Sequence, residues 1–294
     1  MMAVRFLQLD VFCTRAGGGN PLAVVIGADD WPEPAFQAFA RWTNLVETTY
    51  LLRASSPGAS YRLRIHTPER EIPFAGHPTV GSAHAALQCG LVQPVSGLLV
   101  QECGAGLLPI RVDGSGRGRR IFVKAPPATV LIDGIEARSR VGTLLDGLSL
   151  GALGVAFVEG GRRWWLAELA DESALRHWRP DHRAIGELAR ASDSLGLCVF
   201  ARSAQGGYQL VVRAFPAGVG IIEDPASGAA NALIAAYIAQ ALPQGALARG
   251  YRVSQGRELG KDAVIDVEID LDGQPWVGGQ TQTVIDGALD WPLS

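Results

Sequence analysis

The sequence predicts an α+β protein with two similar halves, each holding a helix packed deep against a curved β-sheet. Two long stretches without Asp, Glu, Lys or Arg, residues 72–101 and 225–248, are the first observation. In each half an apolar strand ends in a loop of small residues with a proline and an ionisable side chain, and a charge-free helix follows. Such a helix is expected to be surrounded by protein on most sides. The repetition indicates an internal structural duplication, although residue identity between the halves is slight.

Length and charge limit the classes of protein to consider. A chain of 294 residues forms two domains or one large one, and either can bury a core. Hydrophobic residues make up 48% and charged residues 19%, which is typical of globular proteins. The net charge of −3 and the lack of a long Lys/Arg run argue against a nucleic-acid partner.

The sequence also argues against targeting segments, membrane spans and disulfides. Arg5 and Asp10 interrupt the apolar N-terminus, so a secretory signal is not expected. Both charge-free stretches are broken by Pro, Gly, Gln and Ser, and we expect them to form core rather than to cross a membrane. The four cysteines show no CxxC spacing and predict reduced thiols in a cytoplasmic protein.

Strands are predicted from alternation and from β-branched and aromatic residues. The first two are joined by a glycine-rich turn, and 48–52 and 61–66 are expected to be neighbours in a sheet. The predicted strands cover residues 4–12, 22–26, 48–52, 61–66, 155–159, 164–167, 197–200 and 209–214.

Three segments have the spacing of helices. Residues 32–42 place Phe36 and Phe39 on one face, with Asp30 as a possible N-cap. The first charge-free helix has Pro78 in its first turn and ends at Gly90. The second follows the loop IIEDPASG. If the two charge-free helices point their N-termini at one another, their unpaired N–H groups and positive dipole ends would favour a carboxylate substrate in a cleft.

Glu47 is the candidate for proton transfer. It is the only charged residue between Thr43 and Leu52, and its neighbours are mostly apolar. If the carboxylate is shielded from water its pKa rises toward the working pH, which suits a group that both takes and gives a proton. The alternative is a strand residue that faces solvent.

Two histidines lie in or near the first charge-free helix. His77 comes at its entrance, where it could contact a substrate or orient an acid, although a histidine there is often structural. His84 falls on the apolar face and is interpreted as a core residue without a functional role. The two are seven residues apart with no third ligand in view, so no metal site is predicted.

The loop before the second charge-free helix holds the other candidates. Asp224 or Ser227 could cap the helix, which alone explains either residue. The functional alternative is that Asp224 fixes an amino or hydroxyl group, while Ser227, Gly228 and Ala229 offer backbone N–H groups to a carboxylate. Nucleotide-binding and zinc-hydrolase motifs are absent from the sequence.

Four motifs in order resemble the PhzF-like family of phenazine biosynthesis. The resemblance extends over nearly the whole chain, continues through SQGRELG and VGG, and is diffuse across residues 125–206. The motifs are GNPLAVV at 19–25, NLVETTYLL at 44–52, PFAGHPTVGSAHAAL at 73–87 and VRAFPAGVGIIEDPASGAA at 212–230.

The resemblance implies the diaminopimelate-epimerase fold, with two similar domains, each a curled, barrel-like sheet wrapped around a central helix, and the active site in the cleft between them. We place the domains at 1–124 and 125–294; the alternative is that the last strand returns to the first domain. The related epimerases and proline racemases use two opposed thiols, and here His77 and Asp224 stand in the matching loops. Two-cysteine racemisation is therefore not expected.

The resemblance also implies roles for the candidate residues. In the phenazine enzyme a glutamate matching Glu47 moves a proton on dihydro-3-hydroxyanthranilate. His77, Asp224 and Asn20 are then expected to bind substrate or orient protons, and the turns around Gly76 and Gly228, the latter with Ser227 and Ala229, to hold its carboxylate. No metal or organic cofactor is implied, and the family resemblance alone implies a homodimer.

Two positions depart from the phenazine enzyme. Ala229 replaces an expected serine, and Asn231 stands where a glycine is common. A site built around a hydroxyl contact discriminates strongly, so the lost hydroxyl argues more against the phenazine substrate than against the reaction type. The prediction is a cofactor-independent isomerase or epimerase of a small carboxylate-bearing metabolite. The alternatives are a non-catalytic small-molecule-binding protein on the same fold, and a lyase or dehydratase that uses the same glutamate.

Overall fold

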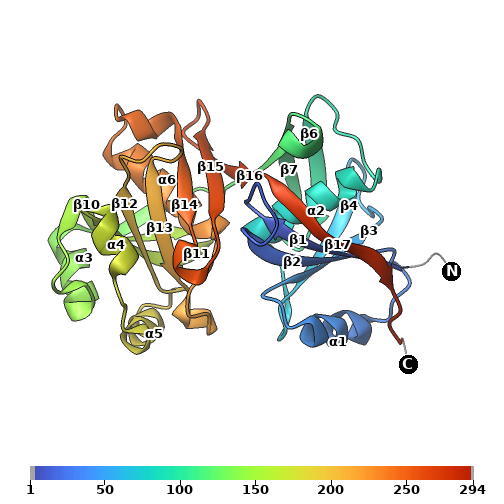
Figure 1. Ribbon diagram of the computed structural model, residues 1–294, viewed down its shortest axis with the longest axis horizontal. Coiled ribbons are helices and arrows are strands. Elements are labelled where there is room, and N and C mark those ends of the chain that lie inside the picture. Colours follow the sequence, from blue (N-terminus) through green and yellow to red (C-terminus); the bar gives the residue numbers. More distant parts are fainter. Residues whose placement is uncertain (1–3, 293–294) are drawn as a thin grey trace. The chain divides into compact units, whose positions relative to one another are not determined.

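The computed structural model describes residues 4–292 and divides into two compact units (Figure 1). The N-terminal unit combines residues 1–124 with 278–294, and the C-terminal unit comprises residues 125–277. Strand β16 (Pro275–Gly279) carries the chain from the second unit back into the first.

The N-terminal unit is a curled sheet in the order β17-β1-β2-β3-β4-β6-β7-β8. The β2–β3 and β4–β6 pairs are parallel and the others are antiparallel, while short β5 pairs with β4. Its strands are β1 (Val4–Val11), β2 (Asn20–Ile26), β3 (Thr48–Leu52), β4 (Tyr61–His66), β5 (Glu71–Ile72), β6 (Leu98–Cys103), β7 (Gly106–Asp113), β8 (Arg120–Lys124) and β17 (Thr281–Leu289).

Helix α2 (Gly76–Gln88) is the core of this unit. It contacts β1, β2, β3, β4, β8 and β17, strands that span the sheet from one end to the other, so the sheet curls around the helix. Ten of its 13 residues are buried. At Gly81 an added Cβ would lie 2.5 Å from Cδ2 of Leu22, so the helix approaches β2 at a distance that only glycine allows.

The C-terminal unit repeats this plan with strand order β9-β10-β11-β12-β13-β14-β15. The β11–β12 and β13–β14 pairs are parallel and the others are antiparallel. Its elements are β9 (Thr129–Asp133), α3 (Gly134–Val141), β10 (Leu150–Gly160), β11 (Arg162–Leu169), α4 (Glu172–His177), α5 (His182–Ala191), β12 (Leu197–Arg202), β13 (Leu210–Phe215), α6 (Gly228–Ala241), β14 (Gly250–Gln255) and β15 (Ala263–Ile269).

The pairing patterns confirm the predicted duplication. From β1 to β7 the pairs run antiparallel, parallel, antiparallel, parallel, antiparallel, and the same succession runs from β10 to β15. Helix α6 takes the place of α2, because each follows the fourth strand of its series and packs inside the curl. At Gly160 an added Cβ would lie 2.5 Å from Cδ2 of Leu233 on α6, which repeats the close approach seen at Gly81.

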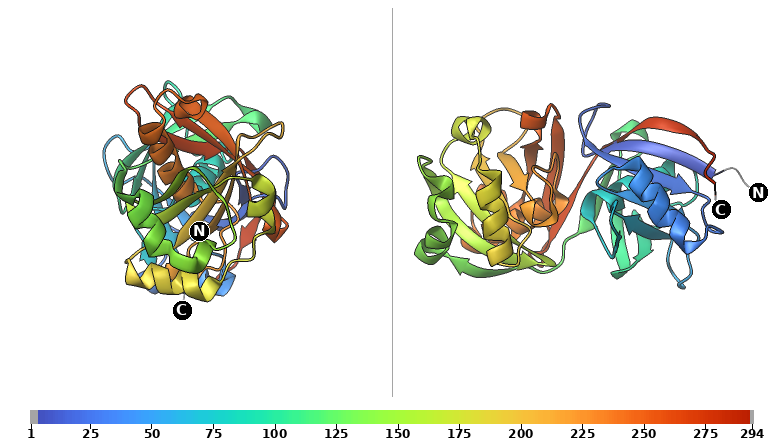
Figure 2. Two further views of the ribbon diagram at one scale, coloured as in Figure 1. Left: turned by 90° about the vertical axis from the view of Figure 1, so that its left-hand side faces the viewer. Right: turned by 90° about the horizontal axis from the view of Figure 1, so that it is seen from below.

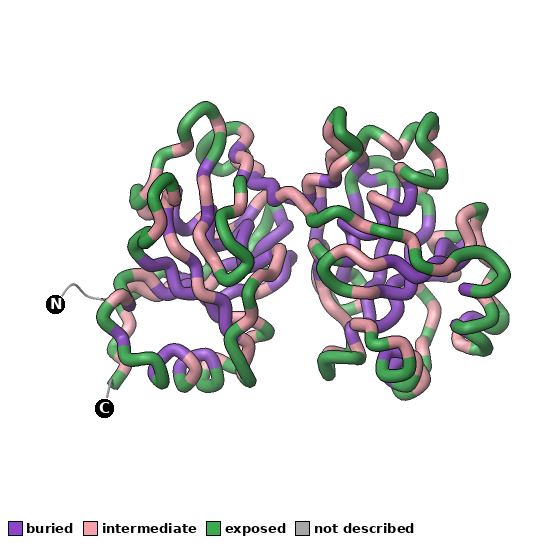
Figure 3. The backbone as a smooth tube through the Cα atoms, turned by 180° about the vertical axis from the view of Figure 1, so that it is seen from behind, coloured by how far each residue is buried: buried purple, intermediate pink, exposed green. Residues whose placement is uncertain are grey.

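The remaining helices lie outside the two sheets (Figures 1 and 2). Helix α1 (Glu33–Thr43) buries Phe36 and Phe39 against Tyr50 of β3. Its N-cap is Pro32 rather than the predicted Asp30, because proline at the helix start presets the backbone and leaves Asp30 two residues upstream. Buried residues are concentrated in the strands and central helices of each unit (Figure 3).

Several other predictions are settled by the fold. The strands predicted at 48–52 and 61–66 are β3 and β4 with identical bounds, and the four predicted in the second half lie within or overlap β10 to β13. All four cysteines are free thiols, and Cys13 and Cys198 are buried. Among residues 4–292, no helix has both the length and the apolar character needed to cross a membrane.

Candidate functional site

Glu47 lies between α1 and β3, on the residue immediately before the strand begins. Two buried threonines hold the start of β3. The hydroxyl of Thr48 lies 2.8 Å from that of Thr43 at the end of α1. The hydroxyl of Thr49 donates to the carbonyl of Ala23 at 3.1 Å and accepts from Ser82 of α2 at 2.9 Å. The backbone that carries Glu47 is therefore pinned to both α1 and α2.

His77 faces Glu47 from the first turn of α2. Its Nε2 lies 3.4 Å from Oε2 of Glu47, and the two side chains are only 8% and 12% exposed. On the other side of the ring, Nδ1 lies 3.4 Å from the side-chain nitrogen Nδ2 of buried Asn20. Burial lowers the pKa of His77 to about 3, against the opposing effect of a hydrogen bond with the backbone of Pro21. The imidazole is therefore neutral at physiological pH.

The start of α2 has no side-chain cap. Its N-cap is Ala75, and Gly76 is half-buried in the first turn beside His77. The amides of a first helical turn have no intrahelical partner, so this end can accept an anion. His84 lies farther along the helix, half-buried, with Nε2 2.9 Å from Oε1 of Gln88. A structural role for His84 agrees with that contact.

Asp224 lies in the C-terminal unit, in the loop between β13 and α6. Its backbone amide donates to the carbonyl of Ala214 on β13 at 2.9 Å, and its Oδ1 accepts from the amide of Ala226 at 3.0 Å. The residue is half-buried. Burial raises the pKa of the Cys198 thiol on β12, and the negative charge of Asp224 raises it further.

Ser227 is the N-cap of α6, and its hydroxyl accepts from the amide of Ala230 at 3.4 Å. Its own amide donates to the side chain of Gln255 at 3.3 Å. Gly228 is half-buried and Ala229 is exposed. Their amides belong to the first turn of a helix and have no carbonyl one turn earlier within it.

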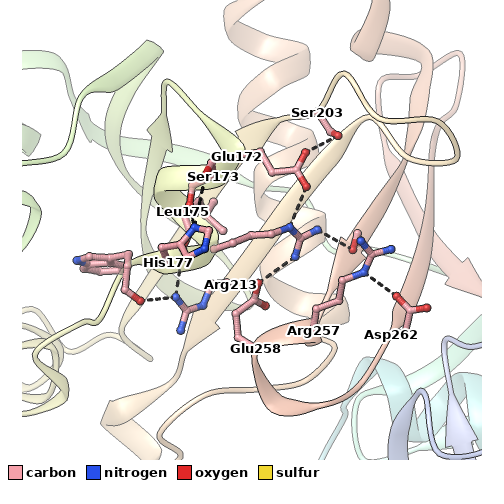
Figure 4. A network of polar contacts seen from close by, with 12 residues as sticks. Glu172, Ser173, Leu175, His177, Ser203, Arg213, Arg257, Glu258 and Asp262 are labelled. Carbon is pink, nitrogen blue, oxygen red and sulfur yellow. Dashed lines mark hydrogen bonds and ion pairs between the residues drawn. The ribbon is translucent and has the colours of Figure 1, made fainter.

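A buried ion pair beside this loop was not anticipated from the sequence. Arg213 of β13 binds Glu223 through two hydrogen bonds, each of 2.9 Å, and the side chains are 3% and 6% exposed. Arg213 also donates to the carbonyls of Leu175 and Trp178 at the end of α4, the first of which is labelled in Figure 4. The detectable signal was an arginine inside the apolar run LVVRAF, which has to find a partner once the strand is buried.

The candidate residues thus form two groups. Asn20, Glu47, Gly76 and His77 lie together in the N-terminal unit, and the residues from Asp224 to Ala229 lie together in the C-terminal unit. That the two groups meet in one cleft stays a prediction. Within residues 4–292, no cluster of three or more His, Cys, Asp or Glu side chains has the arrangement of a metal site.

Comparisons with known proteins identify the family. The model of the phenazine biosynthesis-like family matches residues 9–287. The chain belongs to that family. A relative from Schizosaccharomyces pombe, named antisense-enhancing sequence 1, is 32% identical, with 96% of this chain and 97% of the relative covered. Trans-2,3-dihydro-3-hydroxyanthranilate isomerase from Pseudomonas aeruginosa is 30% identical, with 87% of each chain covered.

A solved structure supports the same fold. The PhzF-family phenazine biosynthesis protein of Bacillus anthracis superposes with a TM-score of 0.82 at 23% identity, covering 99% of this chain and 100% of that one. The predicted fold, a curled sheet around a central helix in each of two similar halves, is therefore confirmed. The chain is a PhzF-family isomerase.

Proposed function

We propose that Glu47 is the general acid/base of this isomerase, taking a proton from one carbon of its substrate and returning it to another. The observation that supports this most directly is a carboxylate 12% exposed and 3.4 Å from a buried histidine. Because the pKa of His77 is about 3, the ring carries no charge that would hold Glu47 permanently in an ion pair. The carboxylate can therefore hold a proton in one step and release it in the next.

His77 acts as a neutral partner in this scheme. Its ring is fixed by burial and by the contact with Asn20, so it orients the carboxylate without exchanging protons with the substrate. Thr48 and Thr49 help to position Glu47 through the backbone, because their hydroxyl contacts fix the start of β3, which directly follows Glu47. These contacts favour a fixed position for the group that handles the proton.

The substrate is proposed to be a small molecule with a carboxylate. The amides of Gly228 and Ala229 open α6 and, with the positive end of the helix dipole, suit an anionic group. Asp224 next to them suits an amino or hydroxyl group of the same molecule. The P. aeruginosa relative is named for trans-2,3-dihydro-3-hydroxyanthranilate, which carries all three groups. Because Ala229 offers no hydroxyl, we propose a related molecule as the preferred substrate.

The test is turnover in deuterium oxide with trans-2,3-dihydro-3-hydroxyanthranilate and a panel of related small carboxylates. Glu47→Gln is expected to retain the fold and to lower both turnover and deuterium incorporation by roughly 10²–10⁴-fold, the range for loss of a general acid/base. Glu69→Gln, at an exposed glutamate of the same unit, is the matched control and is expected to behave as wild type.

An active Glu47→Gln variant would overturn the proposal. Mass spectrometry of the product formed in ordinary water separates isomerisation, which leaves the mass unchanged, from dehydration, which removes one water. A compound that stabilises the wild-type protein and is never converted would instead favour a binding protein on this fold.

A further inference from the structure

The motif SQGRELG has no role in the chemistry above, yet its second and third residues, Gln255 and Gly256, contact the loop that holds Asp224. Gln255 ends β14 and is completely buried, with 0% exposure. Gly256 follows with φ of +89°, and an added Cβ there would lie 2.5 Å from the carbonyl oxygen of Pro225. The loop between β13 and α6 therefore rests on the backbone at the end of β14.

The carboxamide of Gln255 contacts both ends of this loop. Its Nε2 donates to the carbonyl of Asp224 at 2.8 Å. Its Oε1 accepts from the amide of Ser227 at 3.3 Å. One side chain therefore sets the distance between Asp224 and the first turn of α6, which is where the proposed carboxylate donors Gly228 and Ala229 begin.

Asn231 completes the arrangement from inside α6. It is fully buried, and its Nδ2 donates to Oε1 of Gln255 at 3.0 Å and to the carbonyl of Ser227 at 2.8 Å. The side chain of Asn231 thus contacts both Gln255 and the residue that caps α6. It orients the glutamine so that oxygen faces α6 and nitrogen faces Asp224.

The end of β14 is itself held by a polar network (Figure 4). Arg176 donates to the hydroxyl of Ser254 at 3.2 Å and to Glu258 at 2.9 Å, while Arg257 binds Asp262 at 2.8 Å. The residues on both sides of Gln255 and Gly256 are therefore fixed, and the glutamine side chain can serve as a rigid support.

We propose that Gln255 is a positioning residue, oriented by Asn231, which fixes Asp224 relative to the amides that open α6. The proposal rests on the proposed function, because it assumes that this loop binds the substrate. Misplacement of binding groups by about 1 Å costs roughly 10²-fold in rate, so the effect of losing the hydrogen bonds of Gln255 should be readily measured.

The principal variant is Gln255→Met, which keeps the length of the side chain and removes both hydrogen-bonding groups. With trans-2,3-dihydro-3-hydroxyanthranilate, or whichever panel compound the wild type converts, KM is expected to rise roughly 10-fold or more, with a smaller fall in kcat. Hydrogen exchange at the amides of residues 224–231 should rise, and that of β15 should not. Gln240→Met, at an exposed glutamine on the same helix, is the control and should match wild type.

A second variant separates positioning from loss of folding. Gln255→Glu keeps the acceptor and lacks the donor at neutral pH, and protonation of the new carboxyl restores a donor toward Asp224. Its KM relative to wild type should therefore fall as pH is lowered, whereas a smaller folded fraction would lower kcat alone. Asn231→Ala should raise KM less than Gln255→Met and add little to it in the double variant.

The outcomes distinguish this proposal from the one for Glu47. Wild-type KM and wild-type exchange at residues 224–231 in Gln255→Met would overturn the positioning role, whatever Glu47→Gln does. An active Glu47→Gln variant together with a raised KM in Gln255→Met would overturn the acid/base role of Glu47 and would still support the positioning role of Gln255.

Discussion

The starts of the two buried helices, α2 and α6, are held in different ways. α2 begins without a side-chain cap, and its first turn carries a buried neutral histidine against a carboxylate. α6 begins with a serine cap and follows a loop fixed by a glutamine and by a buried ion pair. The same topology therefore supports two kinds of environment. One leaves a titratable group close to an uncharged partner, and the other fixes backbone donors in place.

The largest effect is expected from breaking the ion pair that supports the α6 loop. Arg213→Met leaves the carboxylate of Glu223 buried without its partner, and should lower the free energy of unfolding by about 3–5 kcal/mol. Urea denaturation measures the change. The double variant Arg213→Met/Glu223→Leu should recover much of the loss, and a single variant as stable as wild type would contradict the argument.

An intermediate effect is expected from the buried histidine at the start of α2. His77 has a pKa of about 3 in the folded protein, whereas an ordinary histidine exposed to solvent has a pKa of 6.5, so between these values the unfolded chain binds a proton that the folded protein does not. The contribution of His77 to the free energy of unfolding is fully present above the pKa that it has in the unfolded chain. This contribution is lost as the pH falls toward the pKa that His77 has in the folded protein.

Between about pH 7 and about pH 5, wild type should therefore lose about 2 kcal/mol more than His77→Gln, at 1.36 kcal/mol per unit below the unfolded pKa. Denaturation at the two pH values tests this. His177→Gln, at an exposed histidine of the other unit, is the control and should follow wild type. Equal losses in wild type and His77→Gln would show that the ring is not a buried neutral group.

A comparable effect is expected from the hydroxyl contacts behind Glu47. Thr49→Val keeps the shape of the side chain and leaves the hydroxyl of Ser82 and the carbonyl of Ala23 without this partner. The expected loss of unfolding free energy is about 1–3 kcal/mol. The double variant Thr49→Val/Ser82→Ala should cost less than the sum of the single changes. Additive losses would mean that the two hydroxyls do not interact.

The smallest effect is expected at the cap that α6 has and α2 lacks. Ser227→Ala removes the acceptor for the amide of Ala230 and should cost about 1 kcal/mol in thermal or urea denaturation. Ser227→Gly should cost less than Ser227→Ala, since glycine is tolerated at this position. If alanine is as stable as serine there, the loop is held by Gln255 and Arg213 alone.

The sequence predicted the elements whose signals are local. Thr48–Leu52 and Tyr61–His66 carry the β-branched, aromatic and alternating residues of strands, and both were predicted with their observed bounds. The charge-free stretches marked the central helices because the surrounding sheet excludes water from their faces. The helix was predicted over 32–42, close to its observed bounds, but its N-cap was predicted wrongly as Asp30, since proline geometry at the helix start outweighed a favourable capping residue.

The contacts around the site depend on strand register and could not be derived from local patterns. Asn20 meets His77 across 57 residues of sequence, and Gln255 meets Asp224 across 31. Neither pairing has a spacing rule, because each follows from which strand lies beside which. Glu47 and His77 were selected as candidates from their neighbours and from the family resemblance, and their separation of 3.4 Å comes from the structure alone.

The place of β17 in the sheet affects how the protein can be made. This strand, Thr281–Leu289, pairs along the whole of β1, although the entire C-terminal unit lies between the two strands in the chain. Until the C-terminal unit and then β17 have been synthesised, one edge of β1 has no strand beside it and presents open backbone groups that favour aggregation. The N-terminal unit therefore cannot be completed before the C-terminal unit has been made, and the C-terminal unit can assemble ahead of it.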